Sequence, residues 1–124
     1  QLALGDRVLL AGWRGDVQEL ILTFDVFVMP SLWEAMPLAL LEAMAARRAI
    51  VVTDVGDNAE FVSGGGCGIL VKPKDSAGLS RALATLADNR ELVRQLGERA
   101  YARYRSKYAV SHMIDAYERL YRTG

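Results

Sequence analysis

The sequence is poor in cysteine and histidine, and both shortages exclude classes of protein. A single cysteine, Cys67, among 124 residues permits no intrachain disulfide, which excludes a disulfide-stabilised secreted scaffold and favours a reducing compartment. No histidine stands at a metal-ligand spacing from Cys67, so we expect a small buried thiol and predict no metal site. The one histidine, His112, lies in the last predicted helix, where we expect a surface or packing role rather than a catalytic one.

The sequence also lacks an excess of charge of one sign and any long apolar run. Its 15 basic and 15 acidic residues cancel, so no overall field attracts nucleic acid. No apolar run reaches the roughly 18 residues that cross a bilayer, and no stretch resembles a signal peptide. The basic bias of residues 90–107 favours a solvated helix face over a membrane-surface contact. We therefore expect one cytoplasmic domain over residues 1–124.

Apolar segments of strand length alternate with helical patterns from Asp6 to Pro73. Strands that are apolar on both faces and alternate with helices indicate a parallel sheet covered by helices. The prediction is an α/β fold of about four strands with a helical C-terminal tail from Asp75 onward. The predicted strands lie within Asp6–Trp13, Asp25–Ser31, Ala49–Asp54 and Gly64–Pro73, and the predicted helices between them lie within Asp16–Phe24, Pro37–Arg48 and Asp57–Val62.

Loops that follow the strands are the expected place for a ligand, because parallel sheets bind ligands at their carboxyl ends. Three such loops are candidates: Gly12–Arg14, Pro30–Met36 and Thr53–Asn58. The second loop leads into a helix predicted to begin at Pro37, where a proline suits the first helical position. The free N–H groups and positive dipole end of that helix would suit a phosphate group.

Two glutamates, Glu34 and Glu42, flank the start of this nearly apolar helix with seven residues between them. A salt bridge along the helix would need a basic residue three or four positions from Glu42, but those positions hold leucine or alanine. Glu42 therefore needs a distant partner, solvent, or a ligand with hydroxyl groups, such as a ribose. Glu34 could accept hydroxyl groups from a second ring, or it could be a helix-start acid, with Glu42 simply reaching water. Local chemistry leaves both interpretations open.

The stretches DVFVMPSLWEAMPLALLEAMAA, IVVTDVGDNAEFV and GILVKPKD together resemble the C-terminal domain of the family four retaining glycosyltransferases, which have the GT-B fold. The glutamate, seven-residue, glutamate spacing is the hallmark of that family. The resemblance covers nearly the whole chain and includes the strand VLLAGW. It implies a Rossmann-like, truncated half of a GT-B fold that binds a nucleotide-diphosphate sugar.

The resemblance also implies roles for individual residues. Glu42 would hold the ribose hydroxyls, and Glu34 would contact the transferred sugar. Ala35, Met36, Pro37 and Leu38 would supply the segment that faces the diphosphate or sugar. A base or phosphate loop is implied at Gly12, Trp13, Arg14 and Gly56. No metal or other cofactor is implied, because the helix dipole and basic side chains neutralise the leaving diphosphate.

Several departures from the family pattern limit these expectations. Ala35 stands where the family usually has glycine, and Asp57 replaces the second of a usual glycine pair. Arg47 and Ala49 replace a usual glycine and proline in a turn. The family's diphosphate-gripping arginine–lysine pair, its catalytic histidine and its acceptor-binding N-terminal domain all precede the matched segment. We therefore expect a donor-binding domain without a catalytic residue and inactive alone, peripheral to the inner membrane face in the full enzyme.

The order of strands in this family leaves a gap in the predicted sheet. Two strand–helix units of the family precede Gln1, and their strands would lie between Val8–Ala11 and Val26–Met29. Unpaired strand edges invite pairing, so we expect either direct closure of these two strands or a homo-oligomer formed through the exposed edge. The alternative function is a non-catalytic oligomerisation or interaction module that keeps the fold. A third alternative is a different GT-B enzyme, such as a sugar-nucleotide epimerase or a phosphorylase. The phosphorylase would need a pyridoxal-binding lysine, and neither Lys72 nor Lys74 has that context.

Overall fold

The computed structural model describes residues 4–123 and contains a three-stranded parallel sheet. Its strands are β1 (Val26–Met29), β2 (Ala49–Thr53) and β3 (Ile69–Val71), in the order β1-β2-β3. Val28 of β1 is in register with Val51 of β2, which in turn is in register with Ile69 of β3. The predicted parallel α/β architecture is confirmed, with three strands rather than about four.

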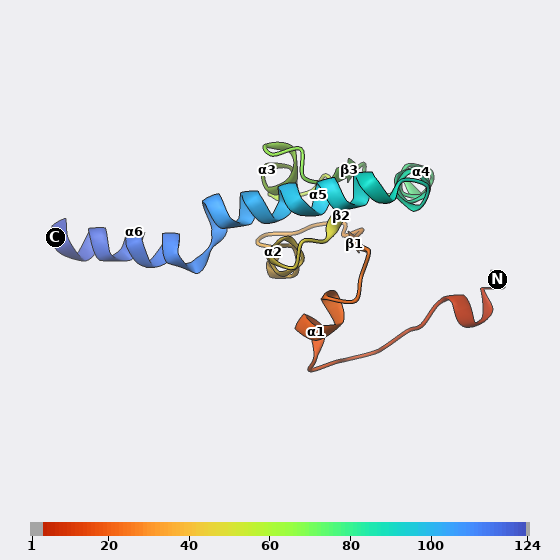
Figure 1. Ribbon diagram of the computed structural model, residues 1–124, viewed down its shortest axis with the longest axis horizontal. Coiled ribbons are helices and arrows are strands. Elements are labelled where there is room, and N and C mark those ends of the chain that lie inside the picture. The colour runs from red at the N-terminus through yellow and green to blue at the C-terminus, as the bar shows by residue number, and fades with distance from the viewer. Residues whose placement is uncertain (1–3, 124) are drawn as a thin grey trace.

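Helices cover both faces of the sheet (Figure 1). The central strand β2 is buried throughout, and its alternating side chains divide between two cores. Ile50 and Val52 join one core with α2, α3 and the end of α5, while Ala49 and Val51 join the other with α4 and α5. The helices are α1 (Val17–Ile21), α2 (Leu38–Ala45), α3 (Asn58–Ser63), α4 (Ser76–Ala87), α5 (Arg90–Arg103) and α6 (Val110–Thr123), with a 3-10 turn η1 (Gly5–Arg7) and a π-helix η2 (Tyr104–Tyr108).

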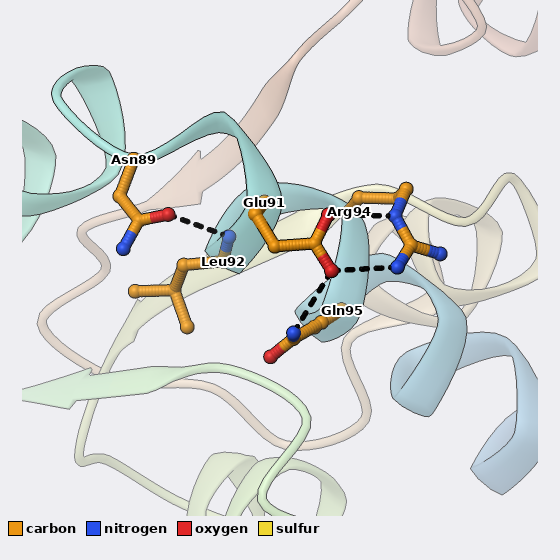
Figure 2. Close-up of polar contacts among 5 residues, drawn as sticks. All are labelled: Asn89, Glu91, Leu92, Arg94 and Gln95. Atoms are coloured by element: carbon orange, nitrogen blue, oxygen red, sulfur yellow. Dashed lines mark hydrogen bonds and ion pairs between the residues drawn. The ribbon is translucent and has the colours of Figure 1, made fainter.

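Polar side chains fix the start of α5, which contributes to both cores. The Asn89 side chain accepts a hydrogen bond from the Leu92 N–H at 2.9 Å, as expected of a helix N-cap. Glu91 accepts hydrogen bonds from Arg94 and Gln95 one turn later (Figure 2). The Arg94 guanidinium lowers the pKa of Glu91 to about 2. An acid in the first turn also complements the helix dipole, so α5 begins at a well-defined residue.

The middle of α5 lies directly against the turn between α2 and β2. A β-carbon at Gly97 would overlap the carbonyl oxygen of Arg47, so this crossing requires glycine. Arg47 itself has a positive φ of 58°, which fits the glycine usual at this position in the family. The Arg47 guanidinium lies 4.2 Å from the centroid of the Tyr101 ring of α5. The arginine at this position thus makes a cation–π contact across the turn.

The lone cysteine is buried as predicted. Cys67 is fully buried and free, and its thiol lies 3.3 Å from the carbonyl oxygen of Val62. Burial raises the pKa of the Cys67 thiol, which makes the reactive thiolate form rarer at neutral pH. Its role is packing beneath α3.

The prediction of a first strand at Val8–Ala11 is wrong. These residues form no strand, and Leu9 and Leu10 are 85% and 91% exposed. The segment runs outward from α1 and does not approach the sheet (Figure 1). The physical reason is that a strand needs a paired edge and a buried face, and nothing among residues 4–123 offers either beside this segment. Direct closure of Val8–Ala11 against β1 therefore does not occur, and in the part of the chain that the structure describes β1 is paired along one edge.

The predicted helical tail is confirmed, and its last helix stands apart from the domain. Every residue of α6 is exposed, and the helix extends away from the sheet and its covering helices (Figure 1). His112 is on its surface, where its Nε2 lies 2.9 Å from the Arg105 carbonyl oxygen. Within the described range, no helix combines the length and the apolar character needed to cross a membrane.

Candidate functional site

The loop after β1 carries Glu34 to the carboxyl end of the sheet. Its carboxylate accepts a hydrogen bond of 2.7 Å from the Ser31 hydroxyl, and the residue is half-buried. The following helix begins one residue later than predicted, at Leu38, with the buried Pro37 in the N-cap position. Pro37 has no N–H to leave unpaired, so the proline costs the helix start nothing. Glu34 is therefore held in place immediately before the positive end of α2.

Backbone amides at the start of α2 differ in their availability. The N–H of Leu38 donates to the carbonyl oxygen of Met36 at 3.0 Å, and Pro37 has no N–H. The N–H groups of Ala35 and Met36 engage no acceptor within the described part of the chain, and both residues are exposed. Of the predicted segment, Ala35 and Met36 thus offer free donors, whereas Leu38 would first have to release its own bond.

The loop after β2 packs tightly against the Glu34 loop. Gly56 has a φ of +51°, and a β-carbon there would overlap the carbonyl oxygen of Glu34. Thr53, at the end of β2, donates its hydroxyl to the Ser31 carbonyl oxygen at 2.6 Å. Because two loops from neighbouring strands are tied together here, the position of Glu34 depends on both. The structure therefore places predicted residue Gly56 directly against Glu34.

Asn58 ends the predicted candidate loop Thr53–Asn58, although the sequence analysis gave it no role, and it is buried beside the end of β2. Its side-chain nitrogen donates to the Thr53 carbonyl oxygen at 2.9 Å, while its Oδ1 is buried and has no hydrogen-bond partner in the described residues. Burial of an unpaired carbonyl oxygen costs about 1–3 kcal/mol. The position of Asn58 after the third predicted strand could have indicated a role in the site. Asparagine is common in turns, however, so the residue type alone does not indicate one.

Glu42 lines a groove of about 520 Å³ between α1, α2 and the π-helix η2. The groove is mostly apolar, and its polar side chains come from Gln18, Glu42, Tyr104 and Tyr108. Glu42 is half-buried and makes no ion pair or hydrogen bond with its side chain among residues 4–123. Burial raises the pKa of Tyr108, whose hydroxyl also lacks a partner in that range. The expectation that Glu42 has no neighbouring cation on its helix is thus met, and its two oxygens can accept hydrogen bonds.

The remaining predicted loop, Gly12–Arg14, lies apart from the two glutamates. Trp13 is 92% exposed, and no atom lies within 4 Å of a β-carbon built on Gly12. Arg14 donates its Nε to Asp16 at 2.8 Å, and this contact lowers the pKa of Asp16. The structure does not bring this turn to the groove, because the strand that should position it does not form.

Two lysines after β3 were also missed as candidate site residues. Lys72 and Lys74 line a small cavity of about 210 Å³ at the carboxyl end of the sheet, together with Pro30 and Thr53. Both lysines belong to the stretch VKPKD, which directly follows a predicted strand. This position could have indicated a site, because parallel sheets bind ligands at the carboxyl ends of their strands. They supply positive charge on the same edge of the sheet as Glu34.

Among the described residues no cluster of three or more histidine, cysteine, aspartate or glutamate side chains could hold a metal ion.

A parallel sheet between helix layers, with its polar loops gathered at the carboxyl ends of the strands, defines this chain as a Rossmann-like α/β domain. Comparison with known proteins identifies its family. The sequence profile of the glycosyl transferases group 1 matches residues 1–103. The chain therefore belongs to this family, and it corresponds to the C-terminal domain of the GT-B fold.

Individual relatives agree with this assignment. The chain is 38% identical over 89 residues to a UDP-Gal:alpha-D-GlcNAc-diphosphoundecaprenol alpha-1,3-galactosyltransferase of Escherichia coli, covering 72% of this chain and 23% of the relative. The solved C-terminal domain of a group 1 glycosyl transferase, LpcC of Francisella tularensis, superposes with a TM-score of 0.69 at 29% identity, covering 78% of this chain and 51% of that one.

A second solved structure, sucrose-phosphate synthase of Thermosynechococcus elongatus, superposes with a TM-score of 0.71 at 26% identity. It covers 81% of this chain and 26% of that structure. The chain spans between about a quarter and a third of the length of the first curated relatives that it matches.

Proposed function

We propose that this chain is the domain of a retaining glycosyltransferase that binds the nucleotide-diphosphate sugar donor. The observation that carries the proposal is Glu42, a half-buried carboxylate that lines a groove and has no cation or hydrogen-bond donor of its own in the described chain. An uncompensated carboxylate in such a place is costly unless a ligand or water satisfies it. The vicinal hydroxyls of a ribose match its two oxygens.

Glu34 and the start of α2 would bind the part of the donor beyond the ribose. The free N–H groups of Ala35 and Met36 lie at the positive end of α2, which suits a diphosphate. Glu34, fixed by Ser31, would accept hydroxyl groups of the transferred sugar. Lys72 and Lys74 would add positive charge on this edge of the sheet. The proposal includes no metal or other cofactor, since these groups can stabilise the leaving diphosphate electrostatically.

The complete reaction would transfer a sugar from a UDP, GDP or ADP donor with retention of anomeric configuration. An acceptor-binding domain outside this chain would bring the second substrate, so we propose that the chain alone is inactive. The E. coli relative is named for transfer from UDP-Gal to a diphosphoundecaprenol-linked acceptor. By analogy, the proposed full enzyme would work in the cytoplasm, peripheral to the inner membrane face.

A titration with nucleoside diphosphates tests the proposal directly. UDP, GDP and ADP would each be added to 15N-labelled chain up to about 5 mM, and amide shifts would be mapped onto the structure. We expect at least one nucleotide to shift the signals of residues 35–42, and Glu42→Gln to weaken that binding about tenfold. Glu60→Gln, which changes an exposed glutamate of α3, is the matched control and should bind like the parent. No shift with any nucleotide would refute donor binding by this chain.

A second candidate function, a non-catalytic oligomerisation module, has one observation in its favour. Within the described residues β1 pairs along one edge, with β2, and Val8, Leu9 and Leu10 lie exposed nearby in sequence. An unpaired edge and an exposed apolar segment can pair between copies. A Leu9→Lys, Leu10→Lys double variant would oppose this pairing without touching the core, because both residues are highly exposed and charges on such a segment disfavour association. Loss of oligomers in that variant, together with the absence of nucleotide binding in the parent, would favour this function.

A further inference from the structure

Two hydroxyl groups connect the carboxylate of Glu34 to the end of β2. The Ser31 hydroxyl donates to Oε1 of Glu34 at 2.7 Å, and the Thr53 hydroxyl donates to the carbonyl oxygen of Ser31 at 2.6 Å. Thr53 is only 3% exposed. One bond therefore fixes the backbone of Ser31, and the other uses the side chain of Ser31 to fix the carboxylate of Glu34.

The protons of these groups determine which atoms remain for a ligand. A hydroxyl group has a single proton to donate. Thr53 and Ser31 both donate theirs within the protein, so neither donates to a ligand while these bonds persist. Oε2 of Glu34 accepts no hydrogen bond from residues 4–123. The loop therefore presents one free acceptor oxygen, whose direction is set by the bond at Oε1.

A glutamate in a loop needs such a bond if it is to bind a ligand well. The long side chain has several rotatable bonds, and restricting them at the moment of binding lowers the affinity. The Ser31–Glu34 distance of 2.7 Å is within the range of charge-assisted O–H···O bonds, which are stronger than neutral ones. Ser31 thus holds the carboxylate of Glu34 in one orientation before a ligand arrives.

The anchor of this arrangement is the central strand of the sheet. Thr53 is the last residue of β2, and every residue of that strand is buried. Its carbonyl oxygen also accepts a hydrogen bond of 2.9 Å from the buried side chain of Asn58. Groups that are held by strands are positioned more precisely than groups that depend on a loop alone. The orientation of Glu34 is therefore set by the sheet.

We propose that Ser31 and Thr53 are positioning residues that direct Oε2 of Glu34 toward one hydroxyl group of the transferred sugar. This inference rests on the proposed function, because it takes Glu34 as the group that contacts the sugar. It goes further in two respects. The sugar contact belongs to a single, pre-oriented oxygen, and its strength depends on two hydroxyl groups that do not touch the ligand.

Calorimetry with nucleoside diphosphates and with their sugar conjugates tests the proposal. The probes are UDP, GDP and ADP and their glucose, galactose or mannose conjugates. Ser31→Ala and Thr53→Val should each weaken the tightest-binding conjugate about fivefold and leave its nucleoside diphosphate within about twofold. Thr53→Ser keeps the hydroxyl group and should restore binding of the conjugate. Ser80→Ala and Thr85→Val, at exposed positions of α4, are the matched controls and should change neither affinity.

A further variant separates positioning from direct contact. In a Glu34→Ala background no carboxylate remains to be oriented, so Ser31→Ala should cause no additional loss of conjugate affinity. In the ligand-free chain, Ser31→Ala and Thr53→Val should also move the NMR signal of the side-chain carboxyl carbon of Glu34, whereas Ser80→Ala should not. A purely structural role would lower the stability of the fold without changing the ratio of the two affinities.

The outcomes distinguish this inference from the proposed function. If neither the nucleoside diphosphates nor the conjugates bind the parent chain, the proposed function fails and the inference fails with it. If they bind, but Ser31→Ala weakens both classes of ligand equally or weakens neither, only the inference is overturned. An additional loss in the Glu34→Ala background would also overturn it, because Ser31 would then contact the sugar itself. A Glu34 carboxyl signal that neither substitution moves would overturn it as well.

Discussion

The carbonyl oxygen of Glu34 occupies the space that a side chain at Gly56 would need. This contact joins the loops that follow β1 and β2, and a hydrogen bond from Thr53 to the Ser31 carbonyl oxygen reinforces it. A glutamate that would face the donor sugar is thus positioned from both neighbouring strands. Gly56 acts on the site through the backbone of Glu34, without any side chain of its own.

Substitution of Gly56 by alanine should destabilise the protein and displace Glu34. A positive φ costs a non-glycine residue about 1 kcal/mol, and the overlap with Glu34 should raise the total to about 2–3 kcal/mol. Gly66→Ala is the matched control, because Gly66 has a φ of +54° but only the end of a flexible arginine, at 3.9 Å, near its β-carbon position. Urea denaturation of both variants measures the difference. Equal losses of stability would mean that the overlap relaxes without cost.

Arg103 should be essential for holding α3 against the end of α5. Its guanidinium donates to the carbonyl oxygens of Phe61 at 2.8 Å and of Glu60, at the C-terminal half of α3. Arg103→Lys keeps the charge but loses the forked geometry, so we expect a loss of about 1–3 kcal/mol in the free energy of unfolding. Arg99→Lys, at an exposed position with one long contact to Gly66, should change stability by less than about 0.5 kcal/mol. Thermal or urea denaturation distinguishes the two outcomes, and equal effects would contradict the role of Arg103.

The start of α5 should lose stability in acid. The pKa of Glu91 is lowered to about 2 by its contacts with Arg94 and Gln95. A group with a lowered pKa in the folded state stabilises the fold above its unfolded pKa, and this contribution disappears as pH falls through the folded value. The stabilisation should therefore decline from about pH 5 to about pH 2. Glu91 is exposed, so the effect should be small.

Glu91→Gln should flatten this part of the pH profile. Urea denaturation at pH 7, 4 and 2.5 compares the variant with the parent, and Glu19→Gln in α1 controls for the loss of one carboxylate elsewhere. If the parent and Glu91→Gln lose stability in parallel between pH 5 and pH 2.5, the Glu91–Arg94 contact does not contribute.

Glu34 and Glu42 should affect different parts of the donor. If Glu42 binds ribose, Glu42→Gln should weaken a nucleoside diphosphate and its sugar conjugate by similar factors of about ten. If Glu34 binds the sugar, Glu34→Gln should weaken only the sugar conjugate and leave the nucleoside diphosphate unchanged. Calorimetry with both ligands separates the two roles. Equal effects of the two substitutions on both ligands would contradict the assignment.

Much of the architecture could be predicted because its signals are local. Ala49–Asp54 is apolar nearly throughout and contains the fully buried β2, and Pro37 marked the start of α2 to within one residue. Asp75 and Asn89 cap their helices through side-chain hydrogen bonds to the backbone. Hydrophobic periodicity and capping act within a few residues, so they can be recognised without tertiary contacts.

The first predicted strand failed because a strand is defined by its partners. Val8–Ala11 has the composition of a buried strand, yet it lies exposed because no strand pairs with it within residues 4–123. Without that strand, the loop at Gly12–Arg14 is not held against the sheet and does not reach the site. Asn58 and Gly56 could not be ranked from the sequence, because their importance arises from contacts with Thr53 and Glu34 across two strands.

The most direct test of the central claim is the amide spectrum of the chain during titration with UDP, GDP and ADP. We predict saturable shifts at Ala35, Met36 and residues around Glu42, with about tenfold weaker binding in Glu42→Gln and no change in Glu60→Gln. An unchanged spectrum with all three nucleotides at about 5 mM, or shifts that Glu42→Gln leaves unaltered, would contradict the assignment of this domain as a donor-binding site.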